Sequence, residues 1–190
     1  MQIEAINIHK AFGDNIVLNG FSHTFAHGKT TAIMGQSGCG KSTLLAILMG
    51  TLEADSGEIV AESFRKSAVF QEDRLCENLT AAANIRLVTG KKLSPEVLSR
   101  EFAAVGLDGC ENKPVRELSG GMKRRVALLR AMLAEYDVLF LDEPFKGLDE
   151  ETKNDVIAYV KRKTAGKTAI LVTHDKMECE MLADEMIQLK

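Results

Sequence analysis

The chain has 190 residues, of which 45% are hydrophobic and 27% are charged, with a formal net charge of -3. A chain of this length and composition can bury a core, so disorder is excluded, and its slightly acidic balance gives no reason to expect nucleic acid as a partner. Its longest apolar stretches fall far short of the roughly 20 residues that span a bilayer, and no secretion signal follows Met1. We therefore expect a cytoplasmic protein that does not itself cross the membrane.

The first third of the chain begins with short, partly alternating apolar patterns, as in Ile6–Phe12, with turn signals at residues 13–15 and at Asn19-Gly20. This pattern predicts an antiparallel β lead-in. The apolar run Thr30–Met34 then predicts a buried strand, which leads through a glycine-rich turn into a helix over Lys41–Met49.

The middle of the chain is predicted to be mainly helical. Short strands are expected at residues 58–61 and 67–70. One helix is then expected near residues 80–88, and a second begins at Ser94-Pro95, where serine can cap and proline suits the first helical position. We therefore predict a helical subdomain over about residues 76–115.

Helix-like and strand-like patterns alternate again in the last third. The expected elements are an amphipathic helix over residues 122–133, a strand at 138–141, a helix at 150–164, and strands at 168–173 and 186–189. Such alternation is typical of an α/β fold on a largely parallel sheet. We predict a single α/β domain over residues 1–190, with a core from 1–75 and 116–190 around the helical subdomain.

A glycine-rich motif lies between the first buried strand and its helix. It matches the Walker A pattern of P-loop proteins and consists of Gly35, Gln36, Ser37, Gly38, Cys39, Gly40, Lys41, Ser42 and Thr43. Its glycines let backbone N–H groups surround an anion, and the helix N-terminus adds partial positive charge. Lys41 can reach the terminal phosphates and Ser42 can place a hydroxyl on Mg²⁺. A tight turn with an exposed lysine would match by chance in roughly one chain in a hundred or fewer.

Two acids end the apolar strand at residues 138–141. Asp142 is expected at the carboxyl edge of the sheet beside the P-loop, where it suits coordination of Mg²⁺ through water. Glu143 points differently and can accept the proton of an attacking water as a general base. Behind a Walker A motif, this pair indicates nucleotide hydrolysis.

The segment Leu118–Met122 opens the amphipathic helix about twenty residues before these acids. It resembles the signature of ABC ATPases, Leu-Ser-Gly-Gly-Gln, with methionine in place of the last residue. Physically, Ser119, Gly120 and Gly121 at a helix N-terminus form a second anion cradle, without a lysine.

Further residues resemble the ABC set in family order. Gln71 resembles the Q-loop glutamine, which contacts Mg²⁺ or its water, and His174 resembles the switch histidine that contacts the terminal phosphate. Asp149, in Gly147-Leu148-Asp149, resembles the D-loop aspartate and is also a good N-cap for the next helix. Phe12 matches the aromatic that stacks on adenine; a core role is the alternative.

The resemblance implies a motor subunit of an ABC transporter that binds ATP with Mg²⁺ and forms a head-to-tail homodimer on ATP binding. It implies a separate transmembrane permease as partner, contacted through about Gln71–Asn84, so the chain would be peripheral at the cytoplasmic face of the membrane. The segment Val69–Leu75 resembles nitrate, sulfonate and taurine-type importer ATPases. Cys76-Glu77-Asn78 departs from the Leu-Pro-Trp of that group, which leaves the substrate class open.

The same motifs bear on other function classes. A soluble ABC ATPase, for example of iron-sulfur assembly, remains an open alternative, whereas a DNA-repair ATPase would need a coiled-coil insert. A GTPase is opposed by Asn112-Lys113-Pro114, which lacks the guanine-reading aspartate, and a kinase would leave Leu118–Met122 unexplained. An inactive scaffold is opposed by the presence of Lys41, Asp142, Glu143 and His174.

Overall fold

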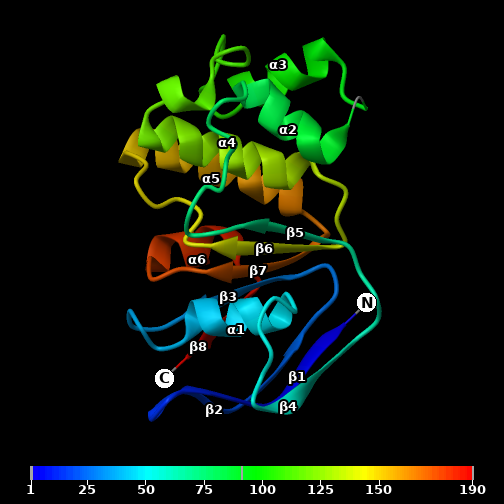
Figure 1. The fold of residues 1–190 in the computed structure, drawn as a ribbon, viewed down its shortest axis with the longest axis vertical. Helices are drawn as coiled ribbons and strands as arrows, with labels where there is room; N and C mark the ends of the chain where they lie inside the picture. Colours follow the sequence, from blue (N-terminus) through cyan, green and yellow to red (C-terminus); the bar gives the residue numbers. More distant parts are fainter. Residues whose placement is uncertain (1, 91, 190) are drawn as a thin grey trace.

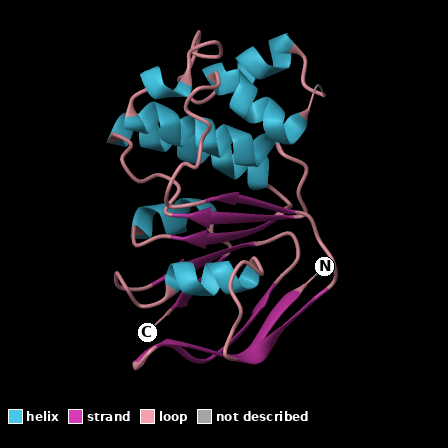
Figure 2. Cartoon of the chain, viewed as in Figure 1, coloured by secondary structure: helices cyan, strands magenta, loops and turns pink. Residues whose placement is uncertain are grey.

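The computed structural model describes residues 2–90 and 92–189. Met1, Lys91 and Lys190, which the predicted domain boundaries include, lie outside the described residues. Figures 1 and 2 show an antiparallel sheet at one end, a parallel sheet in the middle and a layer of helices at the other end. None of the helices formed by the described residues is both long and apolar enough to cross a bilayer.

The antiparallel sheet is the predicted lead-in. It consists of β1 (Ile3–Phe12), β2 (Asn15–Phe25) and β4 (Ser56–Ala61), in the order β2-β1-β4. The turn predicted at residues 13–15 joins β1 and β2, but the turn predicted at Asn19-Gly20 is wrong, because β2 continues through it. Ile8 pairs with Phe21 and His9 with Asn19, so Gly20, at φ +75°, is the extra residue of a β-bulge.

The central sheet contains five parallel strands in the order β5-β6-β7-β3-β8. They are β3 (Thr30–Met34), β5 (Lys66–Val69), β6 (Val138–Asp142), β7 (Thr168–Val172) and β8 (Glu185–Gln188). Every residue of β6 and β7 is buried. Leu139 and Leu141 pack into the core beneath α4 and α5, whereas Val138 and Phe140 pack into the core on the α1 side. Burial on both faces explains why these strands read as continuous apolar runs.

Seven helical segments connect the strands in the described part of the chain: α1 (Lys41–Leu48), α2 (Ala81–Thr89), α3 (Pro95–Ala103), the 3₁₀ turn η1 (Val115–Glu117), α4 (Gly120–Leu133), α5 (Glu150–Thr164) and α6 (Lys176–Leu182). The predicted cap of α3 is confirmed, because Ser94 accepts a hydrogen bond from the Val97 N–H. The short helix α6 was not predicted; seven residues give only about two turns of periodicity.

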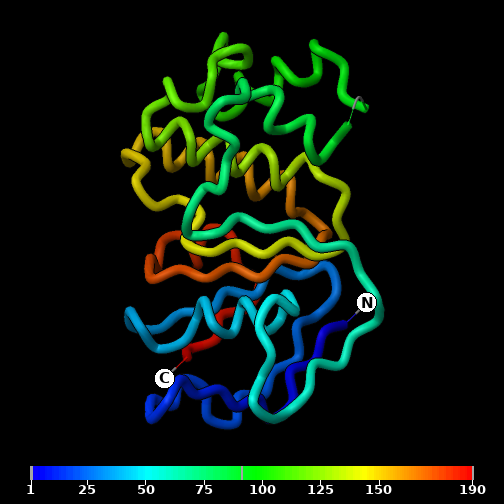
Figure 3. The backbone as a smooth tube through the Cα atoms, viewed as in Figure 1, coloured from blue at the N-terminus to red at the C-terminus, as the bar shows by residue number. Residues whose placement is uncertain are grey.

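The helices on this side of the parallel sheet form two successive layers. Helices α4 and α5 lie next to the parallel sheet, and α2 and α3 lie beyond them (Figure 1). Figure 3 follows the chain from β5 into this layer and back through α4 to β6. Because α2 packs against α4, which begins after residue 115, the helices of the predicted subdomain share a core with the following helix. The boundaries at about residues 76 and 115 remain a prediction.

Candidate nucleotide site

A cavity of about 570 Å³ opens at the carboxyl edge of the parallel sheet. Most of the predicted P-loop residues line it, together with the predicted aromatic, glutamine, glutamate and histidine. The lining residues are Phe12, Val17, Gly35, Gln36, Ser37, Gly38, Gly40, Lys41, Ser42, Thr43, Gln71, Glu143, Lys146, Val172 and His174. Phe12 is 52% exposed, so the alternative that it is a core residue is wrong.

The glycine-rich loop between β3 and α1 depends on close backbone packing. A Cβ on Gly40, the N-cap of α1 at φ +96°, would lie 2.6 Å from Val17 Cγ1. A Cβ on Gly35 would lie 2.7 Å from the Leu189 carbonyl oxygen and 2.5 Å from Cys39 Sγ. The Cys39 side chain therefore packs on the Gly35 side of the loop, while its neighbours line the cavity. Only glycine fits at these two positions without displacing neighbouring atoms.

Lys41 is the first residue of α1 and is buried. Its ammonium group donates hydrogen bonds to the carbonyl oxygens of Gly35 and Gln36, both at 2.8 Å. An ammonium has three donors, so one remains for a further acceptor at the cavity. The loop thus holds a positive charge beside a helix N-terminus, an arrangement that favours an anion.

Asp142 ends β6 and is buried, although it is not among the residues that line the cavity. Its Oδ1 atom has no hydrogen-bond partner among the described residues. Burial raises the pKa of the Asp142 carboxyl, although the neighbouring Ser42 hydroxyl acts in the opposite direction. A buried carboxylate oxygen without a donor, beside a serine hydroxyl, matches the hard oxygen ligands that Mg²⁺ prefers.

Glu143 and His174 form a hydrogen-bonded pair at the carboxyl ends of the adjacent strands β6 and β7. His174 Nδ1 and Glu143 Oε1 are 2.9 Å apart. The Glu143 backbone has φ +48°, and its N–H donates to the Val172 carbonyl at 2.9 Å. Two of the three residues predicted to be catalytic, Glu143 and His174, therefore meet at one edge of the sheet, and the third, Gln71, lines the same cavity.

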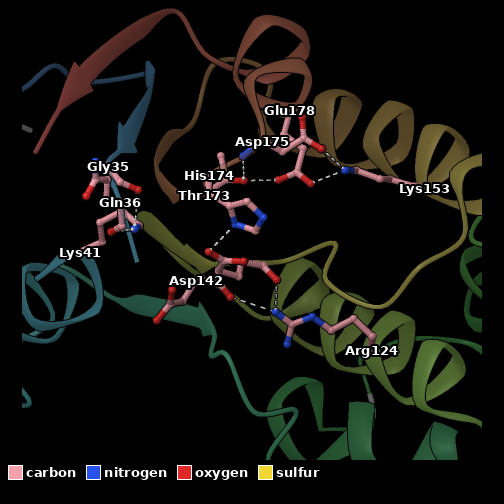
Figure 4. A network of polar contacts seen from close by, with 11 residues as sticks. Gly35, Gln36, Lys41, Arg124, Asp142, Lys153, Thr173, His174, Asp175 and Glu178 are labelled. Atoms are coloured by element: carbon pink, nitrogen blue, oxygen red, sulfur yellow. Dashed lines mark hydrogen bonds and ion pairs between the residues drawn. The ribbon is translucent and has the colours of Figure 1, made fainter. Parts of the chain in front are cut away.

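A polar network behind His174 was not predicted from the sequence. Thr173 donates a hydrogen bond of 2.5 Å to the buried Glu178, which forms an ion pair of 2.6 Å with Lys153. Asp175 also pairs with Lys153, and its N–H donates to the Thr173 hydroxyl (Figure 4). These contacts tie α5 and α6 to the backbone on both sides of His174.

Arg124 on α4 was also missed, because one arginine in the run Lys123–Arg125 looks no different from a surface residue. It is buried, and its guanidinium donates to backbone carbonyls near both Glu143 and Gln71. Val17 and Lys146, which line the cavity, carried no motif in the sequence.

The signature residues lie outside this cavity. Ser119 is exposed and caps α4 by accepting a hydrogen bond from the Met122 N–H at 3.3 Å. A Cβ on Gly120 would have no atom within 4 Å, and one on Gly121 would lie 3.5 Å from the Gly147 carbonyl. Asp149 accepts a hydrogen bond from the Thr152 N–H, which confirms that it caps α5. The structure therefore brings together the P-loop group of predicted residues but not the signature group and Asp149.

Comparison with known proteins gives a consistent result. A family model described as ABC transporter matches residues 18–146. An aliphatic sulfonates import ATP-binding protein of Rhizobium johnstonii is 39% identical, over 98% of this chain and 73% of its own length. A spermidine/putrescine import ATP-binding protein of Mycoplasma capricolum is 34% identical over 97% of this chain and 58% of its own length. The chain therefore spans little more than half the length of that relative.

A solved structure has the same fold. A dimeric bacterial ABC transporter cassette, MJ0796, superposes with a TM-score of 0.85 at 26% identity, covering 99% of this chain and 94% of that chain. A second structure of that cassette is a dimeric post-hydrolysis state bound to ADP and Pi, with the same TM-score and coverage.

Proposed function

This chain belongs to the ABC transporter family of ATP-binding proteins, and from that premise we propose that it is the ATP-hydrolysing motor subunit of an ABC importer. The observation that carries the proposal is that one cavity is lined by both the P-loop and the Glu143–His174 pair. Both relatives described above are named as import ATP-binding proteins, which supports import as the direction of transport.

The cavity has the parts that an adenine nucleotide needs. The amides of the loop Gly35–Gly40 and the Lys41 ammonium would hold the phosphates, which carry several negative charges. Phe12 offers an exposed aromatic face at the same cavity, on which the base would stack. This assignment of Phe12 and the loop is part of the proposal.

The residues present also fit Mg²⁺. Ser42 supplies a hydroxyl, and Asp142 Oδ1 is a buried carboxylate oxygen without a donor among the described residues. Gln71, like Ser42, lines the cavity and would add an amide oxygen. When bound, the ion would neutralise negative charge on the phosphates as the terminal phosphoryl group is transferred.

Hydrolysis would depend on Glu143 as general base. One of its carboxylate oxygens would take the proton of the attacking water, whose oxygen then bonds to the terminal phosphorus while the bond to the ADP oxygen breaks. The hydrogen bond between Glu143 Oε1 and His174 Nδ1 would orient the carboxylate and leave the rest of the imidazole directed toward the cavity.

The exposed signature supports a homodimer as the working state. Ser119, Gly120 and Gly121 form an open helix N-terminus that does not contribute to the cavity of its own chain. In the proposed dimer, the signature of one chain would close over the ATP bound to the P-loop of the other. ATP would then stabilise the dimer, and hydrolysis would release it.

The proposed permease contact lies on the helical side, near the end of β5. The segment predicted to make this contact, about Gln71–Asn84, follows β5 and includes the exposed side chain of Leu79. A separate membrane subunit seated there would place the chain at the cytoplasmic face, attached to the membrane only through that subunit.

The experiment that tests this function is copurification of the tagged chain from native membranes, followed by a phosphate-release assay with ATP and Mg²⁺. We expect an integral membrane protein to copurify, and the complex to hydrolyse ATP. Lys41→Met should abolish hydrolysis, whereas Lys29→Met, which changes an exposed lysine beside β3, should not. Absence of hydrolysis would contradict the ATPase. Hydrolysis with only soluble assembly proteins bound would favour the iron-sulfur alternative over the importer.

A further inference from the structure

Arg124 connects the two sides of the candidate active site. We propose that it is a positioning residue, which fixes the turn carrying Glu143 and links that turn to the loop carrying Gln71. Its side chain is only 4% exposed and extends from α4 (Figure 4), two residues after the signature in the sequence. The inference rests on the proposed function, because it assigns a role in ATP hydrolysis.

The guanidinium satisfies three consecutive backbone carbonyls of the Glu143 turn. Nε donates to the Pro144 oxygen at 2.9 Å, and Nη2 donates to the Asp142 oxygen at 2.9 Å and the Glu143 oxygen at 2.5 Å. Charge-assisted hydrogen bonds of this kind are stronger than neutral ones. The turn is therefore held from the α4 side by one buried cation.

The turn needs such an anchor because Glu143 has a left-handed backbone, with φ +48°. Residues with a side chain rarely adopt this conformation, and it persists where surrounding contacts impose it. The conformation decides where the Glu143 carboxylate points, toward His174 at 2.9 Å. Holding the carbonyls on both sides of the Glu143 Cα thus aims the catalytic carboxylate.

The remaining donors of Arg124 reach the loop on both sides of Gln71. Nη1 donates to the Phe70 carbonyl at 2.6 Å and to Asp73 Oδ1 at 3.1 Å. A guanidinium has five N–H donors, and here five acceptors match them. A displacement of the Gln71 loop would therefore be passed to the Glu143 turn through one rigid planar group.

Lysine cannot replace this arrangement, because its ammonium has three donors and no planar fork. Arg124→Lys keeps the charge and loses the bridge between the two segments. We expect its kcat for ATP hydrolysis to fall at least about tenfold while KM changes by less than about threefold, since the interaction acts through the base and not through ATP binding.

Arg130→Lys is the matched control. Arg130 lies on the same helix and donates to the carbonyls of Asp73 and Arg74, but it makes no hydrogen bond to the described residues 142–144. We expect its kcat to stay within about threefold of wild type. An equal loss in both variants would assign the effect to the loop alone and overturn the proposal.

A double-mutant cycle separates positioning from general structural damage. The cycle compares Arg124→Lys in the wild-type and Glu143→Gln backgrounds, with rates measured by single-turnover hydrolysis. If Arg124 acts through Glu143, then Arg124→Lys should change the residual rate of the Glu143→Gln variant by less than about twofold. A tenfold loss in both backgrounds would refute the inference, as would a rise in KM with unchanged kcat.

A second variant, Asp73→Ala, tests the inference if Arg124→Lys fails to fold, because it removes one acceptor and leaves Arg124 in place. We expect it to lower kcat about threefold with Glu143 present and to have no effect without it.

The proposed function and this inference fail in different ways. A wild-type chain that does not hydrolyse ATP with its copurified partner contradicts the proposed function and the inference together. A wild-type chain that hydrolyses ATP, beside an Arg124→Lys variant with the same kcat, overturns only the role of Arg124.

Discussion

The chain contains two anion cradles, each at a helix N-terminus, and they differ in how much of a site surrounds them. The loop before α1 faces Phe12, Gln71, Glu143 and His174 across one cavity. The signature before α4 has an exposed serine cap, and a Cβ on Gly120 would meet nothing within 4 Å. A helix N-terminus alone therefore does not make a nucleotide site; opposing groups are needed. For the signature, those groups are expected from a second copy.

The largest effect is expected from removing the general base beside the P-loop cradle, in a variant that leaves the shape of both cradles unchanged. Glu143→Gln preserves size and hydrogen bonding but cannot accept a proton, so hydrolysis should fall roughly 10²- to 10⁴-fold. ATP binding should survive, and removal of a negative charge near the phosphates should favour the closed dimer. Phosphate release and light scattering with size exclusion measure the two effects.

For Glu143→Gln, the wild-type chain with ADP is the control, and it should be mostly monomeric. A Gln variant that stays monomeric with saturating ATP would undermine the proposed pairing of the two cradles. Hydrolysis at the wild-type rate would remove Glu143 from the role of base.

The second-largest effect is expected from obstructing only the signature, the cradle before α4. Ser119→Arg, added to Glu143→Gln, fills the signature with a bulky cation and should weaken the ATP-bound dimer at least about 30-fold, an energy of about 2 kcal/mol. Affinity of the monomer for ATP should not change. Dimerisation and nucleotide titration, measured on the same samples, separate the two cradles.

Ser94→Arg is the matched control for Ser119→Arg, because Ser94 also caps an exposed helix start, that of α3. It should lose a cap and keep the dimer. Loss of the dimer in both variants would indicate a general effect of disturbing helix caps rather than a role of the signature.

The third prediction concerns how the P-loop cavity recognises the base of the nucleotide. Because Phe12 offers a stacking face rather than a hydrogen-bond pattern, GTP should compete with ATP within roughly tenfold, or about 1.4 kcal/mol. Phe12→Ala should weaken both nucleotides by a similar, roughly tenfold factor. Ile16→Ala, an exposed residue of the same sheet outside the cavity lining, should not. A titration with near-absolute preference for ATP would require a base-reading group.

The smallest effect is expected at Lys146, which lies between the two cradles. Its side chain lines the cavity, and the carbonyl of the next residue, Gly147, is close to Gly121 of the signature. Lys146→Met should weaken ATP binding roughly threefold, the scale of an exposed charge pair. A control on the same protein, ADP binding, should change less, since one phosphate is missing. Equal effects on ADP and ATP would show that Lys146 does not face the terminal phosphate.

Much of the fold could be predicted from the sequence, because the two main signals, apolar runs and capping residues, are local. The runs Thr30–Met34 and Val138–Leu141 predicted buried strands, and capping residues such as Ser94 marked where helices begin. The bulge at Gly20 was mistaken for a turn, because Asn-Gly signals a positive φ without saying whether the strand stops. Helix α6 is too short to show a period.

The site was readable where chemistry follows a fixed spacing along the chain, as in the loop before α1. Arg124 and the Lys153–Glu178 pair could not be found in this way, because their partners lie far away in sequence. Arg124 differs from its half-buried neighbours Lys123 and Arg125 only in being fully buried, which depends on how α4 packs against β5. Pattern reasoning therefore located the groups predicted to contact ATP and missed the groups that hold them.

The order of strands in the parallel sheet has a consequence for synthesis of the protein. Within the described residues, the neighbours of strand β3, which precedes the phosphate loop, are β7 and β8, and β7 begins at Thr168. At about 5–20 residues per second, translation needs on the order of ten seconds between making β3 and making its first neighbour. During that time the loop has no sheet to support it. A nascent chain stalled before β7 should therefore be unable to retain nucleotide, even though its whole phosphate-binding sequence has already left the ribosome.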